Sequence, residues 1–141
     1  MENSLLMTAD LLGLHDAELY LILMNREAKS LQLNFRCVGK QIYKFIFNEV
    51  LTYKINNVQY QNVVSRILVS NANIQFDDDL DQVVRWTCSG SLNDLLISED
   101  NLRQHISNIR SSDLQFFCVE ASWGAEVGVI AKSISVSHES N

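Results

Sequence analysis

The chain has 141 residues, a formal net charge of −6 at pH 7 and an apolar share of 47%. This length suits one domain that buries roughly 68–70% of its unfolded surface, so we expect residues 1–141 to form a single globular domain. Proline is absent and only five glycines occur, which argues against a linker or a low-complexity tail. Because no apolar run approaches the roughly 20 residues of a membrane helix, a membrane span is not expected.

The first half of the chain carries the signals of several β-strands. Residues 1–14 indicate a short helix or a loop laid on the core. Alternating apolar and polar residues then predict half-buried strands joined by short turns. These strands are expected at residues 17–24, 31–37, 42–47, 50–55 and 63–69. Short connections between the first four favour an antiparallel meander, and a short helix is an alternative for the last.

One helix is predicted late in the chain. Residues 80–87 fit a helix and a strand equally well, so that span stays ambiguous. Ser98 is a good N-cap and two acids follow it in the first turn, where the helix dipole favours negative charge. An apolar stripe at helical spacing comes next, and it predicts a helix over residues 99–111.

The C-terminal part returns to β-structure. Residues 114–121 and 126–136 predict a hairpin that turns near Gly124, and a slip in apolar parity predicts a β-bulge near Lys132. The expected fold class is therefore α+β. It consists of a mainly antiparallel sheet, built from the meander and the C-terminal hairpin, with one clear helix late in the chain.

The negative charge of the chain is concentrated in one stretch. Residues 74–100 hold seven acids and the single base Arg85, a local net charge of −6. The acids are Asp77, Asp78, Asp79, Asp81, Asp94, Glu99 and Asp100. A basic partner would relieve the repulsion between these carboxylates and would be attracted over about 8 Å at physiological salt. The same field repels nucleic acid and anionic lipid, so neither is expected as a partner, and a solvated loop is the alternative interpretation.

The cysteines favour a cytoplasmic protein. Cys37, Cys88 and Cys118 are an odd, widely spaced set without a C-x-x-C pair, which is typical of reduced, buried thiols. The first residues also lack the basic and apolar regions of a secretory signal. Single glycines and scattered histidines offer neither a phosphate loop nor metal-ligand spacing, so no cofactor and no metal are expected.

A catalytic alternative depends on the polar cluster before the first expected strand. His15 could act as a base oriented by Asp16, with Glu18 and Gln61 completing a dispersed site. Adjacent strand residues face opposite sides, however, and no nucleophile stands in a supporting sequence context. We therefore expect no enzymatic activity, and we keep a small enzyme around His15 as the alternative.

Four short segments resemble bacterial toxin-immunity families encoded beside polymorphic or contact-delivered toxins. They are the opening Leu14-His15-Asp16-Ala17-Glu18-Leu19, the hydrophobic meander through Val50, the step Gln61-Asn62-Val63 and the hairpin Glu120-Ala121-Ser122-Trp123-Gly124-Ala125-Glu126. The resemblance implies a protein that folds in the cytosol, binds a cognate toxin and occludes it without chemistry. Many toxins of this kind are nucleases with basic grooves, which an acidic inhibitor fills as a mimic of nucleic acid.

The leading hypothesis is a non-catalytic immunity or antitoxin-type protein whose partner is a basic toxin domain. Trp86 is the candidate apolar anchor, because tryptophan is enriched in interface hot spots. The predicted partner-binding residues are Asp77, Asp78, Asp79, Asp81, Trp86, Glu99 and Asp100. A structural or assembly subunit is a further hypothesis. Both a monomer and a homodimer joined through a sheet edge stay open.

Overall fold

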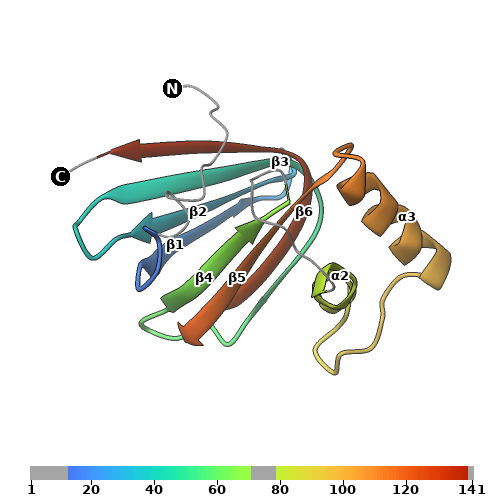
Figure 1. Ribbon diagram of the computed structural model, residues 1–141, viewed down its shortest axis with the longest axis horizontal. Coiled ribbons are helices and arrows are strands. Elements are labelled where there is room, and N and C mark those ends of the chain that lie inside the picture. The colour runs from blue at the N-terminus through green and yellow to red at the C-terminus, as the bar shows by residue number, and fades with distance from the viewer. Residues whose placement is uncertain (1–12, 71–78, 140–141) are drawn as a thin grey trace.

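The fold is an antiparallel β-barrel with helices on one side (Figure 1). The computed structural model describes residues 13–70 and 79–139. Its elements in chain order are β1 (Glu18–Asn25), β2 (Ser30–Arg36), β3 (Ile42–Asn56), β4 (Val63–Val69), α2 (Leu80–Thr87), α3 (Glu99–Arg110), β5 (Gln115–Trp123) and β6 (Glu126–Glu139). The strands close the barrel in the order β1-β2-β3-β6-β5-β4. Neither of the helices in this part of the chain has the length and apolar character needed to cross a membrane.

The expected α+β class is confirmed in its coarse form, a mostly antiparallel sheet with helices. The expectation of one clear helix was wrong, because the ambiguous residues 80–87 are helical as well. The buried residues of α2 are Leu80, Val84 and Thr87, and their i, i+4, i+7 spacing places them on one face of the helix. The helix predicted over residues 99–111 is confirmed as α3, and the Ser98 hydroxyl accepts the cap hydrogen bond from the Asn101 amide at 3.1 Å.

β3 is one long strand, where the sequence predicted separate strands at 42–47 and 50–55. Glu49 adopts a φ of 50°, and Leu51 is an extra residue in the pairing of β3 with β6. A bulge of this kind bends a strand without ending its pairing. The bulge predicted near Lys132 of β6 therefore lies on the neighbouring strand, and β6 pairs with β5 without a shift.

Phenylalanine rings fill the barrel interior. Phe117 contacts Phe47 and Phe45 at ring-centroid distances of 4.9 and 5.0 Å, and Phe35 meets Phe45 edge-on at 5.4 Å. All of these side chains are fully buried. The interior is thus a packed core, as expected for a barrel with few strands.

A second core lies between the barrel and the helices. β5 and β6 bury side chains on both faces here: Phe117 points into the barrel, whereas Phe116 and Ile130 pack against the helical layer. α2 approaches β6 closely at Gly128, where any Cβ atom would collide with the Thr87 side chain. The close approach fixes α2 against the sheet.

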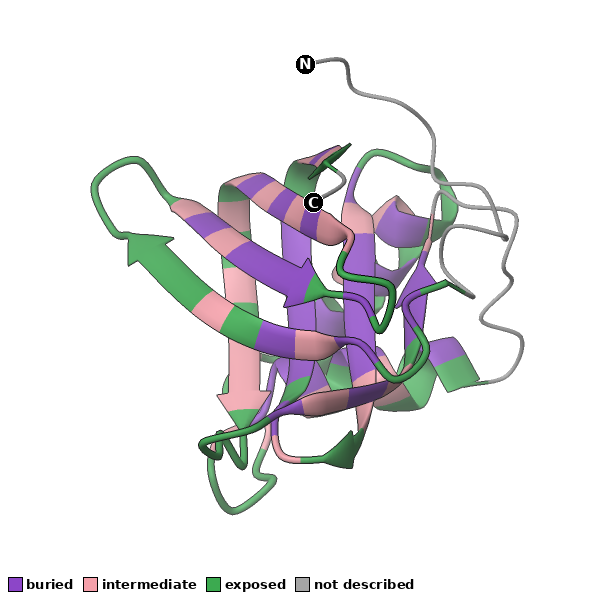
Figure 2. Ribbon diagram, turned by 90° about the vertical axis from the view of Figure 1, so that its left-hand side faces the viewer, coloured by how far each residue is buried: buried purple, intermediate pink, exposed green. Residues whose placement is uncertain are grey.

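The barrel is closed only narrowly between β1 and β4. Glu18 opposite Val63 is the register pair that joins these strands in the described part of the chain. β1 then has an irregularity at Tyr20, and residues 21–25 continue paired with β2. Figure 2 shows the β1–β2 hairpin reaching out from the barrel, with no strand beside the outer edge of β1 toward its tip.

Candidate partner-binding surface

The predicted acidic residues surround the N-termini of the two helices. Asp79 is the N-cap residue of α2 and Asp81 lies in its first turn, while Glu99 and Asp100 occupy the first turn of α3. Asp77 and Asp78 lie outside the described residues. The four described acids belong to the helical layer, but they lie at its two ends: Asp81 contacts Arg110 near the C-terminus of α3, and Glu99 contacts Arg85 near the C-terminus of α2.

Two of these acids are neutralised by arginines from outside the acidic stretch. The Asp81 carboxylate accepts a hydrogen bond from Arg110 at 3.0 Å, and Asp100 accepts one from Arg103 at 2.5 Å. Both arginines belong to α3, beyond residue 100. The local field is consequently weaker than the charge count along the sequence predicted.

Glu99 is also engaged within the helical layer. Arg85 donates two parallel hydrogen bonds to its carboxylate, at 2.8 and 2.9 Å. These bonds lower the pKa of the Glu99 carboxyl below its ordinary value. The pair joins α2 to α3, so Glu99 acts first as a structural link and less as a free contact for a partner.

Three exposed carboxylates near α2 remain available. Asp79, Asp94 and Glu126 form no ion pair with any residue that the structure describes. Asp94 and Glu126 were not among the predicted partner-binding residues. Because no cation offsets them, these side chains keep their full negative field at the surface.

Trp86 borders a small hollow in this layer. The hollow has a volume of about 160 Å³ and is lined by Val83, Trp86 and Cys118 together with Glu120 and Glu126. Trp86 itself is half-buried. At roughly 30 Å³ per water molecule, the hollow accommodates the end of one long side chain. The predicted apolar anchor therefore lies beside carboxylates.

Lys54 of β3 holds the loop after α2 in place. Its ammonium donates to the Ser89 hydroxyl at 2.9 Å, the Gly90 carbonyl at 3.1 Å and Asn93 Oδ1 at 3.3 Å. It also lies 4.5 Å from the centre of the Trp86 ring, within cation–π distance. One cation thus ties strand, helix and loop together. No sequence signal singled it out.

The loop held by Lys54 carries two exposed leucines. The Leu92 side chain is 87% exposed and Leu96 is 67% exposed. Their neighbours Leu95 and Ile97 pack partly against the second core. The loop is therefore anchored on one side and presents apolar side chains on the other. No sequence pattern indicated these leucines, because the segment shows neither strand nor helix periodicity.

The polar cluster proposed for the enzyme alternative lies elsewhere. His15 Nδ1 is 3.3 Å from an Asp16 carboxylate oxygen, and both side chains are more than half exposed. Asp16 adopts a φ of 67° in the turn before β1. Neither these residues nor Glu18 and Gln61 line the hollow beside Trp86 or the groove between the β1–β2 hairpin and β3.

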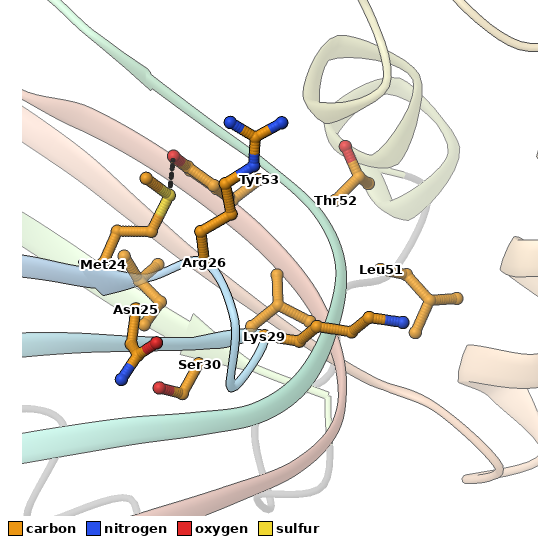
Figure 3. A pocket seen from close by; sticks show the side chains of 10 residues that line it. Met24, Asn25, Arg26, Lys29, Ser30, Leu51, Thr52 and Tyr53 are labelled. Carbon is orange, nitrogen blue, oxygen red and sulfur yellow. Dashed lines mark hydrogen bonds between the residues drawn. The ribbon is translucent and has the colours of Figure 1, made fainter.

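A larger groove opens at the tip of the β1–β2 hairpin. It has a volume of about 320 Å³ and lies between the hairpin and the bent part of β3 (Figure 3). Figure 3 shows Met24 and Tyr53 facing each other across it, with the Tyr53 hydroxyl 2.9 Å from the Met24 sulfur. Arg26 and Lys29 lie at its rim. The sequence analysis predicted no site here.

No family model matches the chain, and no curated protein matches it significantly. Among solved structures, the chain is similar to the crystal structure of an uncharacterized protein from Neisseria gonorrhoeae. The TM-score is 0.48 and the sequence identity 10%, over 87% of this chain and 91% of that chain.

Proposed function

We propose that this chain is a non-catalytic immunity or antitoxin-type protein that acts in the cytoplasm and occludes a cognate toxin domain with a basic surface. One juxtaposition carries the proposal. Trp86 and the unpaired carboxylate Glu126 line a single hollow, and the loop that follows α2 presents the exposed Leu92 and Leu96. Acidic and apolar groups thus adjoin on one surface, the combination that a basic protein partner requires.

The hollow beside Trp86 suits the end of a lysine or arginine side chain from the partner. Arg66 already engages Glu120 through two hydrogen bonds, at 2.7 and 2.9 Å, so Glu126 is the carboxylate left for the incoming cation. The Glu126 carboxylate would pair with the incoming guanidinium or ammonium group, whose alkyl stem would lie beside Trp86, since the Lys54 ammonium already lies over one face of that ring. Such desolvated aromatic anchors dominate binding energy at many interfaces.

The leucine loop supports the same function. Exposed leucines gain free energy when a partner covers them, because apolar surface leaves water. Lys54 already restrains the loop through its contacts to Ser89, Gly90 and Asn93. A restrained loop loses less conformational entropy on binding, which favours affinity.

The experiment identifies the upstream reading frame and coexpresses the C-terminal domain of its product, expected to be a large secreted protein, with this chain. We expect the chain to restore growth and to copurify with that domain. We also expect the association rate to fall as ionic strength rises from about 50 to about 500 mM, because screening weakens the attraction. Full toxicity in the presence of folded chain, or a rate independent of salt, would contradict the proposal.

A set of matched variants tests which acids act. The triple variant Asp79→Asn/Asp94→Asn/Glu126→Gln should slow association roughly tenfold at low salt, because it removes the unpaired carboxylates of this surface. The control is Glu18→Gln/Glu27→Gln/Glu139→Gln, which removes the same charge from residues outside the helical layer. Equal slowing by both triple variants would assign the effect to net charge alone and remove this surface from the mechanism.

A further inference from the structure

The outer edge of β1 is an apolar strand edge without a neighbour in the described structure. Several large apolar side chains of β1 are exposed to solvent: 37% of Tyr20, 38% of Ile22, 56% of Leu23 and 50% of Met24. The register pair Glu18–Val63 ends the contact with β4 before this segment. The backbone N–H and C=O groups on this side of residues 21–25 therefore lack strand partners among the described residues.

Such an edge is normally protected in monomeric proteins. Lysines, prolines, inward charges or repeated bulges keep strand edges from pairing with other chains. β1 has one irregularity, at Tyr20, and no charged side chain from residue 19 to residue 25. Nothing in this segment opposes the addition of another strand.

We propose that the edge of β1 pairs antiparallel with β1 of a second copy of this chain, with Leu23 at the two-fold axis. This inference goes beyond the proposed function and concerns a different surface. The cross-strand register of β1 with β2 determines which side chains share a face. Ile22 and Met24 are opposite the buried Leu33 and Leu31, whereas Leu23 is opposite Gln32 on the outer face.

With the two-fold axis at Leu23, the two β1 strands present complementary side chains to each other on both faces of the sheet. This axis brings Ile22 opposite Met24 of the second copy on the inner face, and Leu21 opposite Asn25 on the outer face. Cross-strand apolar pairs of this kind stabilise an antiparallel sheet. The axis also excludes the irregular residue Tyr20 from the regular ladder.

Charge complementarity favours the same register. Two copies that each carry a net charge of −6 must associate where their acids do not face each other. The paired segment carries no charge, and the symmetry brings Arg26 of each copy to an end of the interface, where its positive charge partly offsets the net charge of the other copy. Arg26 forms no ion pair with a described residue, so its charge is available.

Sedimentation of the purified chain over roughly a hundredfold range of concentration tests the proposal. We expect a reversible monomer–dimer equilibrium. Leu23→Lys should raise the dissociation constant roughly tenfold or more, because it replaces apolar contact with two like charges directly opposite each other. Leu92→Lys is the matched control, since it adds the same charge on the distant loop, and it should leave the equilibrium unchanged.

Cysteine cross-linking tests the register. Leu23→Cys should form a disulfide-linked dimer under mild oxidation, because directly opposite Cα atoms in an antiparallel pair lie about 4.5–5.5 Å apart, within disulfide range. Leu21→Cys alone should not cross-link, whereas a mixture of the Leu21→Cys and Asn25→Cys proteins should. A monomer at every concentration, or cross-linking of Leu21→Cys as fast as Leu23→Cys, would overturn the proposal. Weakening by the control Leu92→Lys instead of Leu23→Lys would do the same.

The two proposals can fail separately. Leu23→Lys should still neutralise the toxin, since the helical layer is intact, and Leu92→Lys should weaken toxin binding without affecting the dimer. If toxin binding is lost with Leu23→Lys and the wild-type chain is a monomer, the edge of β1 binds the toxin and the dimer proposal is wrong.

Discussion

The buried side chain of Asn62 joins three segments of the chain. Its Oδ1 accepts hydrogen bonds from the Gln59 amide at 2.8 Å and the Ala125 amide at 2.9 Å, and its Nδ2 donates to the Gln59 carbonyl at 3.0 Å. Gly124, with a φ of 84°, passes so close to this amide that a Cβ atom would collide with it. The pair of residues therefore fixes the β5–β6 turn against the start of β4.

Replacement of Asn62 should be costly. Asn62→Ala leaves the buried Ala125 amide and the partly buried Gln59 amide without their acceptor, and we expect the free energy of unfolding to fall by about 2–3 kcal/mol. Urea unfolding measures this difference. Asn56→Ala is the control, because Asn56 is exposed at the end of β3 and should change stability by less than about 0.5 kcal/mol. Similar stability for both variants would mean that the Asn62 hydrogen bonds contribute little.

Sequence patterns predicted some residue roles and missed others for a physical reason. Ser98 was expected to cap a helix from its local sequence context, and its hydroxyl accepts the hydrogen bond from the Asn101 amide. The acids were expected to act as one field. Arg110 comes from the later helix and meets Asp81 only when α2 packs on α3, so a charge count within residues 74–100 could not include this neutralisation.

Among the helices and strands, local sequence patterns predicted those elements whose determining residues lie within a single segment of the chain. The α3 helix and the C-terminal hairpin are such elements, because the N-cap, the apolar stripe and the turn glycine lie within them. β3 is different. Its polar residues at 48 and 49 suggested a turn, yet β6 pairs along the whole strand and carries it through the bulge. The pairing of β3 with β6 joins segments that are far apart in the sequence, so local patterns could not reveal it.

The contacts of Lys54 make the loop after α2 a testable element. Lys54→Met keeps an apolar stem but removes the ammonium, and we expect the free energy of unfolding to fall by about 1 kcal/mol. Hydrogen exchange should also speed up at the Gly90 and Leu96 amides, which bond to Asp94 at 2.8 Å and to Cys88 at 3.0 Å.

The control for this prediction is Lys44→Met on the same strand. Lys44 makes no side-chain hydrogen bond or ion pair with a described residue, so its removal should leave exchange in the loop unchanged. Unchanged exchange in Lys54→Met would show that the loop is held by Leu95 and Ile97 and not by the lysine. The affinity argument from a restrained loop would then lose its basis.

For the whole molecule, β5 and β6 contribute alternately to both cores. Phe117 and Val129 belong to the barrel interior, and their chain neighbours Phe116 and Ile130 belong to the core under the helices. Loss of either core therefore removes packing from the same two strands. Because of this sharing, we expect the barrel and the helical layer to unfold together.

The free cysteines report on this cooperativity. Cys37 belongs to the barrel core, whereas Cys88 and Cys118 belong to the second core. Burial raises the pKa of each thiol above its ordinary value, and for Cys118 burial and the nearby Glu120 raise the pKa to about 12. Since the thiolate is the reactive form, the native thiols should resist alkylation at mildly alkaline pH.

The pH dependence follows from the direction of these shifts. A thiol whose folded pKa lies above its ordinary value of 9.0 favours the folded state in its protonated form. This contribution is complete below about pH 9 and is lost as the pH rises toward 12. Native-state stability should therefore decline across that alkaline range, and less so in a Cys118→Ala variant measured against wild type.

Labelling in increasing denaturant then separates one unfolding unit from two. We expect the Cys88 and Cys118 thiols to become reactive at the denaturant concentration at which circular dichroism reports loss of the sheet, because both cores depend on β5 and β6. Cys37 lies just after β2 and serves as the reporter of the barrel. If the Cys88 thiol reacts while the sheet signal and the protection of Cys37 persist, the helical layer opens on its own. In that case the helical layer unfolds separately from the barrel. The affinity of the helical layer for a toxin would then be reduced by the free energy needed to fold the layer onto the barrel.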